Sequence, residues 1–175
     1  MNKLLFSTIE VTRQAFFRSP LSFAIVNLKP IVPGHVLVIP TRPVPRFTDL
    51  NESELASLMT SVQRVGRVIE RAYGADALTI ACQDGKAAGQ SVPHVHFHIL
   101  PRKASGDRFS DNNDAVYPEL EKAGGALATD FAQQGAETGL GFQPLRVDAD
   151  DSRPPRTPDE MEREANWLKG FFQET

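Results

Sequence analysis

The chain has 175 residues, a formal net charge of −3 and a hydrophobic content of 41%, which together indicate one globular domain of ordinary size. The slightly negative charge favours neither nucleic acid nor an anionic membrane as a partner, and no apolar stretch approaches the roughly 20 residues that span a bilayer. The single cysteine, Cys82, cannot form an internal disulfide. We therefore expect a reducing compartment, with the cytoplasm as the first location and the nucleus as the second.

Two strands are predicted near the start of the chain. Residues 21–28 and 35–40 are rich in aliphatic and aromatic side chains, as strands commonly are. Between them, Pro33 and Gly34 suit the middle of a type II turn, in which glycine readily adopts the positive φ that is required. These segments should form a hairpin-like pair.

A long helix and two further strands follow. Asn51 is a good N-cap with Glu54 three residues later, and apolar residues then recur at helical spacing up to Gly74. The segments 77–85 and 93–101 are predicted as strands. Residues 21–101 therefore indicate a β-β-α-β-β unit, an α+β arrangement in which one long helix covers a sheet.

The composition changes after residue 103. The segment 104–156 contains half of the glycines together with scattered acidic residues, and we expect it to be a flexible insertion. Thr157 as N-cap, Pro158 and Glu160 then begin an amphipathic C-terminal helix. The predicted organisation is a domain core over 1–103, the insertion, and a helix over 157–175 that packs on the same domain.

Three of the four histidines lie in the segment PHVHFHILPR, at positions 94, 96 and 98. On a strand these side chains share one face, with consecutive members about 7 Å apart. A purely structural role would require a hydrogen-bond partner for each ring. A metal site shared by all three would require serious distortion, because the outer two lie roughly 13 Å apart on an extended strand, and it would also need His35 to come close.

Nucleophilic catalysis is the alternative that these residues favour. A neutral imidazole can attack an electrophile without further activation, and neighbouring rings disfavour one another's protonation. The preceding loop, DGKAAGQS, contains two glycines whose backbone N–H groups could hold phosphate oxygens. Phosphoryl or nucleotidyl transfer suits this combination, since it depends chiefly on positioning and charge stabilisation.

The segment HVHFHILPR resembles the His-x-His-x-His motif of the histidine triad (HIT) superfamily. LSFAIVNLKPIVPGHVLVIPTRPVPRFTDL and QDGKAAGQSVPHVHFHILPRK are similar to the fragile histidine triad branch, as is the spacing between them. The resemblance covers about residues 21–103, and NDAVYPEL and the C-terminal helix also look like that branch. Pro93 departs from the pattern, because the family usually has a residue with a backbone donor there.

This resemblance implies an antiparallel HIT-like sheet and a role for each histidine. His96 would attack the α-phosphorus of a nucleoside polyphosphate, giving a nucleotidyl-histidine intermediate that water hydrolyses. His94 would support the nucleophile, and His98 and His35 would complete the cluster and recognise phosphate. The residues implied in substrate binding are Asn27 for the ribose, Phe6, Ile25 and Leu37 for the nucleoside, Gln83, Gln90 and Ser91 for the phosphates, and Tyr117 in a flexible loop.

The implied activity is hydrolysis of dinucleoside polyphosphates such as diadenosine triphosphate, giving AMP and ADP. The resemblance implies no tightly bound cofactor and no protein-held metal; Mg²⁺ or Mn²⁺ would accompany the substrate. Two subunits would pair as a homodimer and extend the sheet. Two alternatives stay open at this point, a nucleoside phosphoramidase of the same superfamily and a nucleotide sensor whose slow hydrolysis times a signal.

Overall fold

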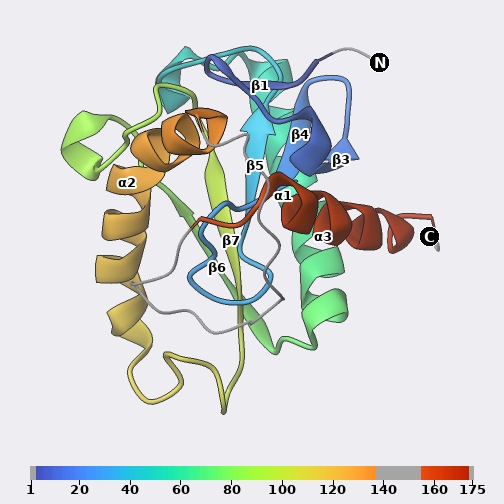
Figure 1. The fold of residues 1–175 in the computed structure, drawn as a ribbon, viewed down its shortest axis with the longest axis vertical. Coiled ribbons are helices and arrows are strands. Elements are labelled where there is room, and N and C mark those ends of the chain that lie inside the picture. The colour runs from blue at the N-terminus through green and yellow to red at the C-terminus, as the bar shows by residue number, and fades with distance from the viewer. Residues whose placement is uncertain (1–2, 137–154, 174–175) are drawn as a thin grey trace.

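A five-stranded antiparallel sheet forms the centre of the protein, as the computed structural model shows for residues 3–136 and 155–173 (Figure 1). Its strands, in spatial order, are β3 (Ala15–Arg18), β4 (Ser22–Val26), β5 (Val36–Pro40), β7 (Phe97–Arg102) and β6 (Ala77–Cys82). A separate two-stranded hairpin consists of β1 (Leu5–Phe6) and β2 (Ile9–Glu10). The predicted α+β class and the antiparallel sheet are confirmed.

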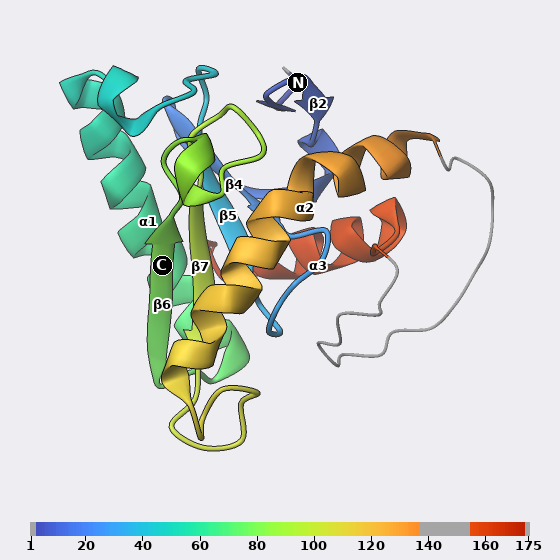
Figure 2. The same cartoon turned by 90° about the vertical axis from the view of Figure 1, so that its left-hand side faces the viewer.

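The two faces of the sheet are covered by different helices (Figure 2). Helix α1 (Glu52–Tyr73) lies on one face and α2 (Val116–Ala136) on the other, whereas α3 (Pro158–Gly170) packs against β3. Four short 3-10 helices complete the fold: η1 (Thr12–Gln14), η2 (Phe47–Asp49), η3 (Lys86–Ala88) and η4 (Asn113–Ala115). Because both faces are covered, β4 and β5 are buried along their whole length.

The ends of α1 and α3 lie where local sequence signals predict them. Asn51 and Glu54 form a reciprocal capping box at the start of α1, and Gly74 ends this helix in the left-handed conformation. Thr157 and Glu160 form the same capping box at the start of α3. Each box satisfies two backbone N–H groups that the first helical turn would otherwise leave unpaired.

The strand predicted over 93–101 was wrong at its start, because β7 begins only at Phe97. Pro93 has no backbone N–H, and the N–H of His94 bonds locally to the carbonyl of Val92 at 2.8 Å. The N–H of Val95 reaches the carbonyl of Val44 at 2.7 Å instead of a neighbouring strand. Only His98 therefore lies in a regular strand, where alternation determines the face on which its side chain lies. His94 and His96 lie in the irregular segment before β7.

Helix α2 lies within the segment that was predicted to be a flexible insertion. Its sequence contains the adjacent residues Gly124 and Gly125, each of which lowers helix propensity by about 1 kcal/mol relative to alanine. Tertiary contacts offset this weakness, since Leu120, Leu127 and Phe131 are buried. Residues 137–154 of the predicted insertion lie outside the described residues.

No helix in the described part of the chain is long and apolar enough to cross a membrane.

Gly34 and Gly74 provide a matched test of backbone and packing constraints. Both have positive φ, but a Cβ on Gly34 would lie 2.6 Å from the Tyr73 ring, whereas a Cβ on Gly74 would meet nothing within 4 Å. We expect Gly74→Ala to cost about 1 kcal/mol of unfolding free energy through backbone strain alone. Gly34→Ala should cost roughly 2–4 kcal/mol, since overpacking adds to the strain. Urea denaturation measures both, and equal losses would contradict the packing argument.

Candidate active site

The four histidines form one buried cluster, although His35 is 59 or more positions from the triad in the sequence. All four are at most 2% exposed. The ring centroids of His35 and His98 are 5.2 Å apart, and those of His96 and His98 are 5.1 Å apart. His35 follows the Pro33–Gly34 turn and enters β5, which pairs with β7, so the sheet brings these distant residues together.

Hydrogen bonds determine where the proton lies on His35 and His98. The backbone N–H of Ile31 donates to Nδ1 of His35 at 3.2 Å, so this nitrogen carries a lone pair. Nε2 of His35 is then the protonated nitrogen, and it donates to Nδ1 of His98 at 2.9 Å. His98 therefore carries its proton on Nε2, a buried atom with no hydrogen-bond partner among the described residues.

The same reasoning gives His96 the opposite tautomer. Its Nδ1 lies 2.8 Å from the backbone carbonyl of His94 and must donate, because a carbonyl oxygen can only accept. Nε2 of His96 therefore has a free lone pair, and it too is buried without a hydrogen-bond partner in the described structure. Two neighbouring rings thus have different free Nε2 atoms: His96 has a nucleophilic lone pair and His98 has a proton to donate.

His94 is fixed by two hydrogen bonds and in turn orients His96. Its Nδ1 accepts the backbone N–H of Ser7 at 2.9 Å, and its Nε2 donates to the carbonyl of Pro40 at 2.8 Å. Both ring nitrogens are therefore occupied, and the carbonyl of the same residue orients His96. His94 therefore positions His96 and has no free nitrogen with which to react.

Burial keeps all four rings neutral. Desolvation lowers the pKa of His96 to about 4, and desolvation followed by the positive charge of Arg156 lowers the pKa of His35 to about 3. Desolvation also lowers the pKa of His94 and takes that of His98 well below its usual value. A neutral ring is the form in which an imidazole nitrogen can act as a nucleophile, so the lone pair on Nε2 of His96 is available throughout the neutral pH range.

Gln83 and Ser91 lie between the sheet and α2. Cys82 pairs with Phe97, and continuing this antiparallel register places Gln83 opposite His96. Oε1 of Gln83 is buried without a hydrogen-bond partner in the described residues, while the hydroxyl of Ser91 donates to the carbonyl of Gly124. These two polar side chains are therefore in positions from which they could meet a phosphate chain beside the histidines.

Gln90 braces the loop that precedes the triad. Its Oε1 accepts the backbone N–H of Gly85 at 2.8 Å, and its Nε2 donates to the carbonyl of Pro45 at 3.0 Å. Both ends of the amide are therefore used within the protein. Contact of Gln90 with a phosphate stays a prediction, and it would require one of these hydrogen bonds to exchange.

The predicted nucleoside-binding residues adjoin the cluster. Leu37 pairs with both Ile25 and His98, so these three side chains share one face of the sheet. The Phe6 ring packs edge-on against His96 with centroids 5.1 Å apart. Asn27 Nδ2 lies 3.2 Å from each ring nitrogen of His35, and its Oδ1 is a further buried oxygen without a hydrogen-bond partner among the described residues.

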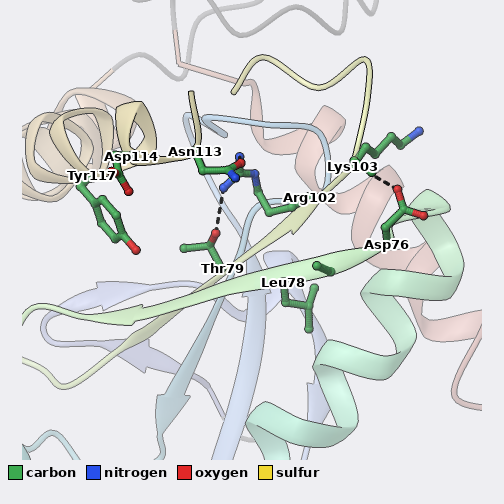
Figure 3. A pocket seen from close by; sticks show the side chains of 10 residues that line it. Asp76, Leu78, Thr79, Arg102, Lys103, Asn113, Asp114 and Tyr117 are labelled. Atoms are coloured by element: carbon green, nitrogen blue, oxygen red, sulfur yellow. Dashed lines mark hydrogen bonds between the residues drawn. The ribbon is translucent and has the colours of Figure 1, made fainter. Parts of the chain in front are cut away.

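Tyr117 lies apart from this group. It is 58% exposed and lines a pocket of about 340 Å³ beside Thr79, Arg102 and Asn113 (Figure 3). The residues that line this pocket include none of the four histidines. The role of Tyr117 in substrate binding therefore stays a prediction.

No group of three or more His, Cys, Asp or Glu side chains in residues 3–136 and 155–173 is arranged to hold a metal ion. The hydrogen bonds above explain this for the histidines. His94 and His35 each have both ring nitrogens bound to protein groups, so within the described residues only Nε2 of His96 and Nε2 of His98 are left free in the cluster.

Two contributors to the site were missed by sequence reasoning. Ser7 donates its backbone N–H to His94 from a two-residue hairpin turn. Its φ of 57° is in the left-handed region, which a serine rarely adopts and which the sequence therefore does not predict. Arg156 donates two hydrogen bonds to the carbonyl of Asn27 from a segment that was predicted to be flexible. The pattern of the printed sequence contains no signal for either contact, because each depends on tertiary packing.

The lowered histidine pKa values predict acid destabilisation. Unfolded histidine protonates with a pKa near 6.5, whereas the folded values for His96 and His35 are about 4 and about 3. Between these limits the unfolded state binds more protons, so stability falls as the pH decreases. From pH 7 to pH 5 we expect a loss of roughly 2 kcal/mol for each of these two rings. Urea denaturation at both pH values measures the loss, and a pH-independent midpoint would contradict burial of the neutral rings.

Comparison with known proteins identifies the family of this chain. The HIT domain family model matches residues 8–105. A bis(5′-nucleosyl)-tetraphosphatase (asymmetrical) of Schizosaccharomyces pombe is 51% identical over 98% of this chain and 96% of its own length. A bis(5′-adenosyl)-triphosphatase of Dictyostelium discoideum is 42% identical over 92% of this chain and 87% of its own. The crystal structure of Plasmodium falciparum diadenosine triphosphate hydrolase shares the fold, with a TM-score of 0.69 at 24% identity over all of this chain and 87% of that one. This chain belongs to the HIT domain family.

Proposed function

We propose that this protein hydrolyses dinucleoside polyphosphates, releasing a nucleoside monophosphate and the remaining nucleotide. The pair of free Nε2 atoms on His96 and His98 carries the proposal, because one has a lone pair and the other a proton. The relatives from Schizosaccharomyces pombe and Dictyostelium discoideum, whose names specify a tetraphosphatase and a triphosphatase, support this substrate class.

In the proposed mechanism, Nε2 of His96 attacks the α-phosphorus and displaces the rest of the phosphate chain. The Nε2–H of His98 donates a hydrogen bond to a phosphate oxygen, where negative charge increases in the transition state. Water then attacks the phosphorus of the nucleotidyl-histidine, the P–N bond breaks, and the monophosphate leaves. His94 and His35 keep their neighbours in the reactive tautomers throughout.

The polar substrate contacts in this proposal use two side chains with an unpartnered oxygen in the described residues, Asn27 and Gln83, together with Ser91, which would exchange its bond to Gly124. The buried Oδ1 of Asn27 would accept a ribose hydroxyl, and Phe6, Ile25 and Leu37 would enclose the nucleoside. The amide of Gln83 and the hydroxyl of Ser91 would bind the phosphate chain. Mg²⁺ or Mn²⁺ would enter bound to that chain, which neutralises part of its charge. A chain with a single cysteine suits the reducing environment of the cytoplasm or nucleus as its place of action.

Replacement of the nucleophile is the decisive test of mechanism. With diadenosine triphosphate and diadenosine tetraphosphate assayed side by side, we expect AMP plus ADP and AMP plus ATP as products. His96→Asn should lower kcat on the order of a thousandfold or more, since the side-chain amide has no nucleophilic nitrogen. Quenching with detergent at alkaline pH, which preserves the acid-labile P–N bond, during turnover of a substrate labelled at the α-phosphate should give labelled wild-type protein but no labelled His96→Asn. Wild-type turnover by this variant would overturn the mechanism, and a faster reaction with a nucleoside phosphoramidate would overturn the substrate class.

We also propose that two subunits pair through β6. This strand is at one edge of the sheet and so has unpaired backbone groups along one side. Its Ile80 side chain is 48% exposed, which is unusual for a large apolar residue in the middle of a strand. An antiparallel partner strand would satisfy the backbone groups and cover this side chain.

Ile80→Glu tests the pairing. A charge at the centre of the proposed interface should convert the dimer to a monomer in size-exclusion chromatography with light scattering, because an unpaired charge is costly to bury. Leu21→Glu is the matched control, since Leu21 is also exposed, at 37%, but lies outside β6. A wild-type protein that is monomeric at micromolar concentration would contradict the proposal.

A further inference from the structure

Helix α2 contacts the residues that the proposed function assigns to the phosphate chain. The hydroxyl of Ser91 donates to the carbonyl of Gly124, and the N–H of Ala128, one turn later, lies 3.4 Å from the same hydroxyl. Gly124 also lies directly against the Gln83 amide, because a Cβ at this position would be 2.9 Å from Cδ of Gln83 and would overlap its Oε1. The helix therefore occupies the side chains of Ser91 and Gln83, which a phosphate chain would need as binding partners.

The same helix covers the nucleophile. Phe131 of α2 packs edge-on against Phe6 with ring centroids 6.0 Å apart, and Phe6 in turn packs on His96. His96 is 2% exposed and its Nε2 is buried. Attack on phosphorus requires direct contact with this atom, so a substrate cannot reach it while Phe6 and α2 keep these positions.

The covered state leaves polar atoms of the site without partners. Nε2 of His96, Nε2 of His98, Oε1 of Gln83 and Oδ1 of Asn27 are all buried and without a hydrogen bond in residues 3–136 and 155–173. Each such group costs roughly 1–3 kcal/mol relative to a satisfied one. A bound nucleotide would satisfy them, so the covered state is destabilised relative to a liganded one at these four atoms.

Contacts in the C-terminal part of α2, which we call its C-terminal half and count from Gly124, offset this cost. Asp130 is buried and pairs with Lys29 at 2.8 Å, and the side chain of Gln134 donates to the carbonyl of Arg156 at 2.9 Å. Leu127 and Phe131 join the main hydrophobic core. The N-terminal half is held separately, since Val116 and Leu120 pack in a second cluster with Leu100 and Phe109. The two halves of the helix are thus anchored to different parts of the protein.

We propose that α2 is an autoinhibitory lid that competes with the phosphate chain of the substrate for Ser91 and Gln83. This inference rests on the proposed function, which assigns these two residues to the substrate. In the closed state the lid covers His96, and nucleotide binds only to molecules in which the C-terminal half of α2 has left this position. The apparent dissociation constant for nucleotide is then the intrinsic constant of the open state divided by the fraction of molecules that are open.

Adjacent glycines supply a matched pair of variants. Gly124→Ala places a methyl group against the Gln83 amide and should disfavour the closed state. Gly125→Ala has the same effect on helix propensity, but a Cβ at Gly125 would meet nothing within 4 Å. Asp130→Asn is a second way to weaken docking, because it removes the ion pair with Lys29 and keeps the shape of the side chain.

Two measurements follow these variants. In hydrogen exchange without ligand, amides of the C-terminal half of α2 should exchange faster in Gly124→Ala and Asp130→Asn than in wild type, and no faster in Gly125→Ala. In calorimetry, Gly124→Ala and Asp130→Asn should bind AMP at least about threefold more tightly than wild type, whereas Gly125→Ala should match it. Saturating AMP should also speed exchange of these amides in wild type.

The outcomes separate the lid from the function. Equal exchange in Gly124→Ala and Gly125→Ala would overturn the lid, as would slower exchange of α2 with AMP bound. Failure of the wild type to hydrolyse dinucleoside polyphosphates would overturn the proposed function. The exchange difference between the two glycine variants would in that case still decide whether α2 docks through Gly124.

Discussion

The hydrogen bond from His35 to His98 is the interaction on which the chemistry of the site depends. Two neutral imidazoles can share a hydrogen bond only if one donates and the other accepts, so the bond gives the pair a direction. That direction places the proton of His98 on its free Nε2. If His35 instead carried its proton on Nδ1, its Nε2 would accept a hydrogen bond from Nδ1 of His98. Nε2 of His98 would then have a lone pair, like Nε2 of His96, and neither ring could donate a hydrogen bond to a phosphate oxygen.

Backbone amides in two turns determine this direction and the tautomer of His94. The N–H of Ile31 occupies Nδ1 of His35, and the N–H of Ser7 occupies Nδ1 of His94. Ser7 donates from a left-handed conformation that costs a non-glycine residue about 1 kcal/mol. The proton positions on His35, His98 and His94 are therefore set by backbone amides in turns that precede β2 and β5, and that on His96 by the backbone carbonyl of His94. No change of pH alters the donor or acceptor character of these backbone groups.

Features that depend on neighbouring residues in the sequence could be predicted, and features that depend on tertiary pairing could not. The capping boxes at Asn51 and Thr157 located both helices, because a cap is a contact between residues three positions apart. The triad motif indicated a nucleophile, yet the regular strand expected for it was wrong, since Pro93 and the bond from Val95 to Val44 delay β7. Helix α2 has two glycines in its interior and depends on buried contacts, so its sequence gave no periodic signal strong enough to predict it.

Two requirements on His96 conflict, and a movable cover reconciles them. A dry environment lowers the pKa of this ring to about 4 and keeps its lone pair available, but the atoms that exclude water also exclude the substrate. A rigid cover would protect the nucleophile and prevent the reaction, whereas an open cleft would admit water and weaken every electrostatic contact within it. A helix with weak intrinsic stability, held by a few side chains over polar atoms that a nucleotide can satisfy, meets both requirements. The unpaired polar atoms under α2 are thus the source of free energy by which the substrate can displace the helix.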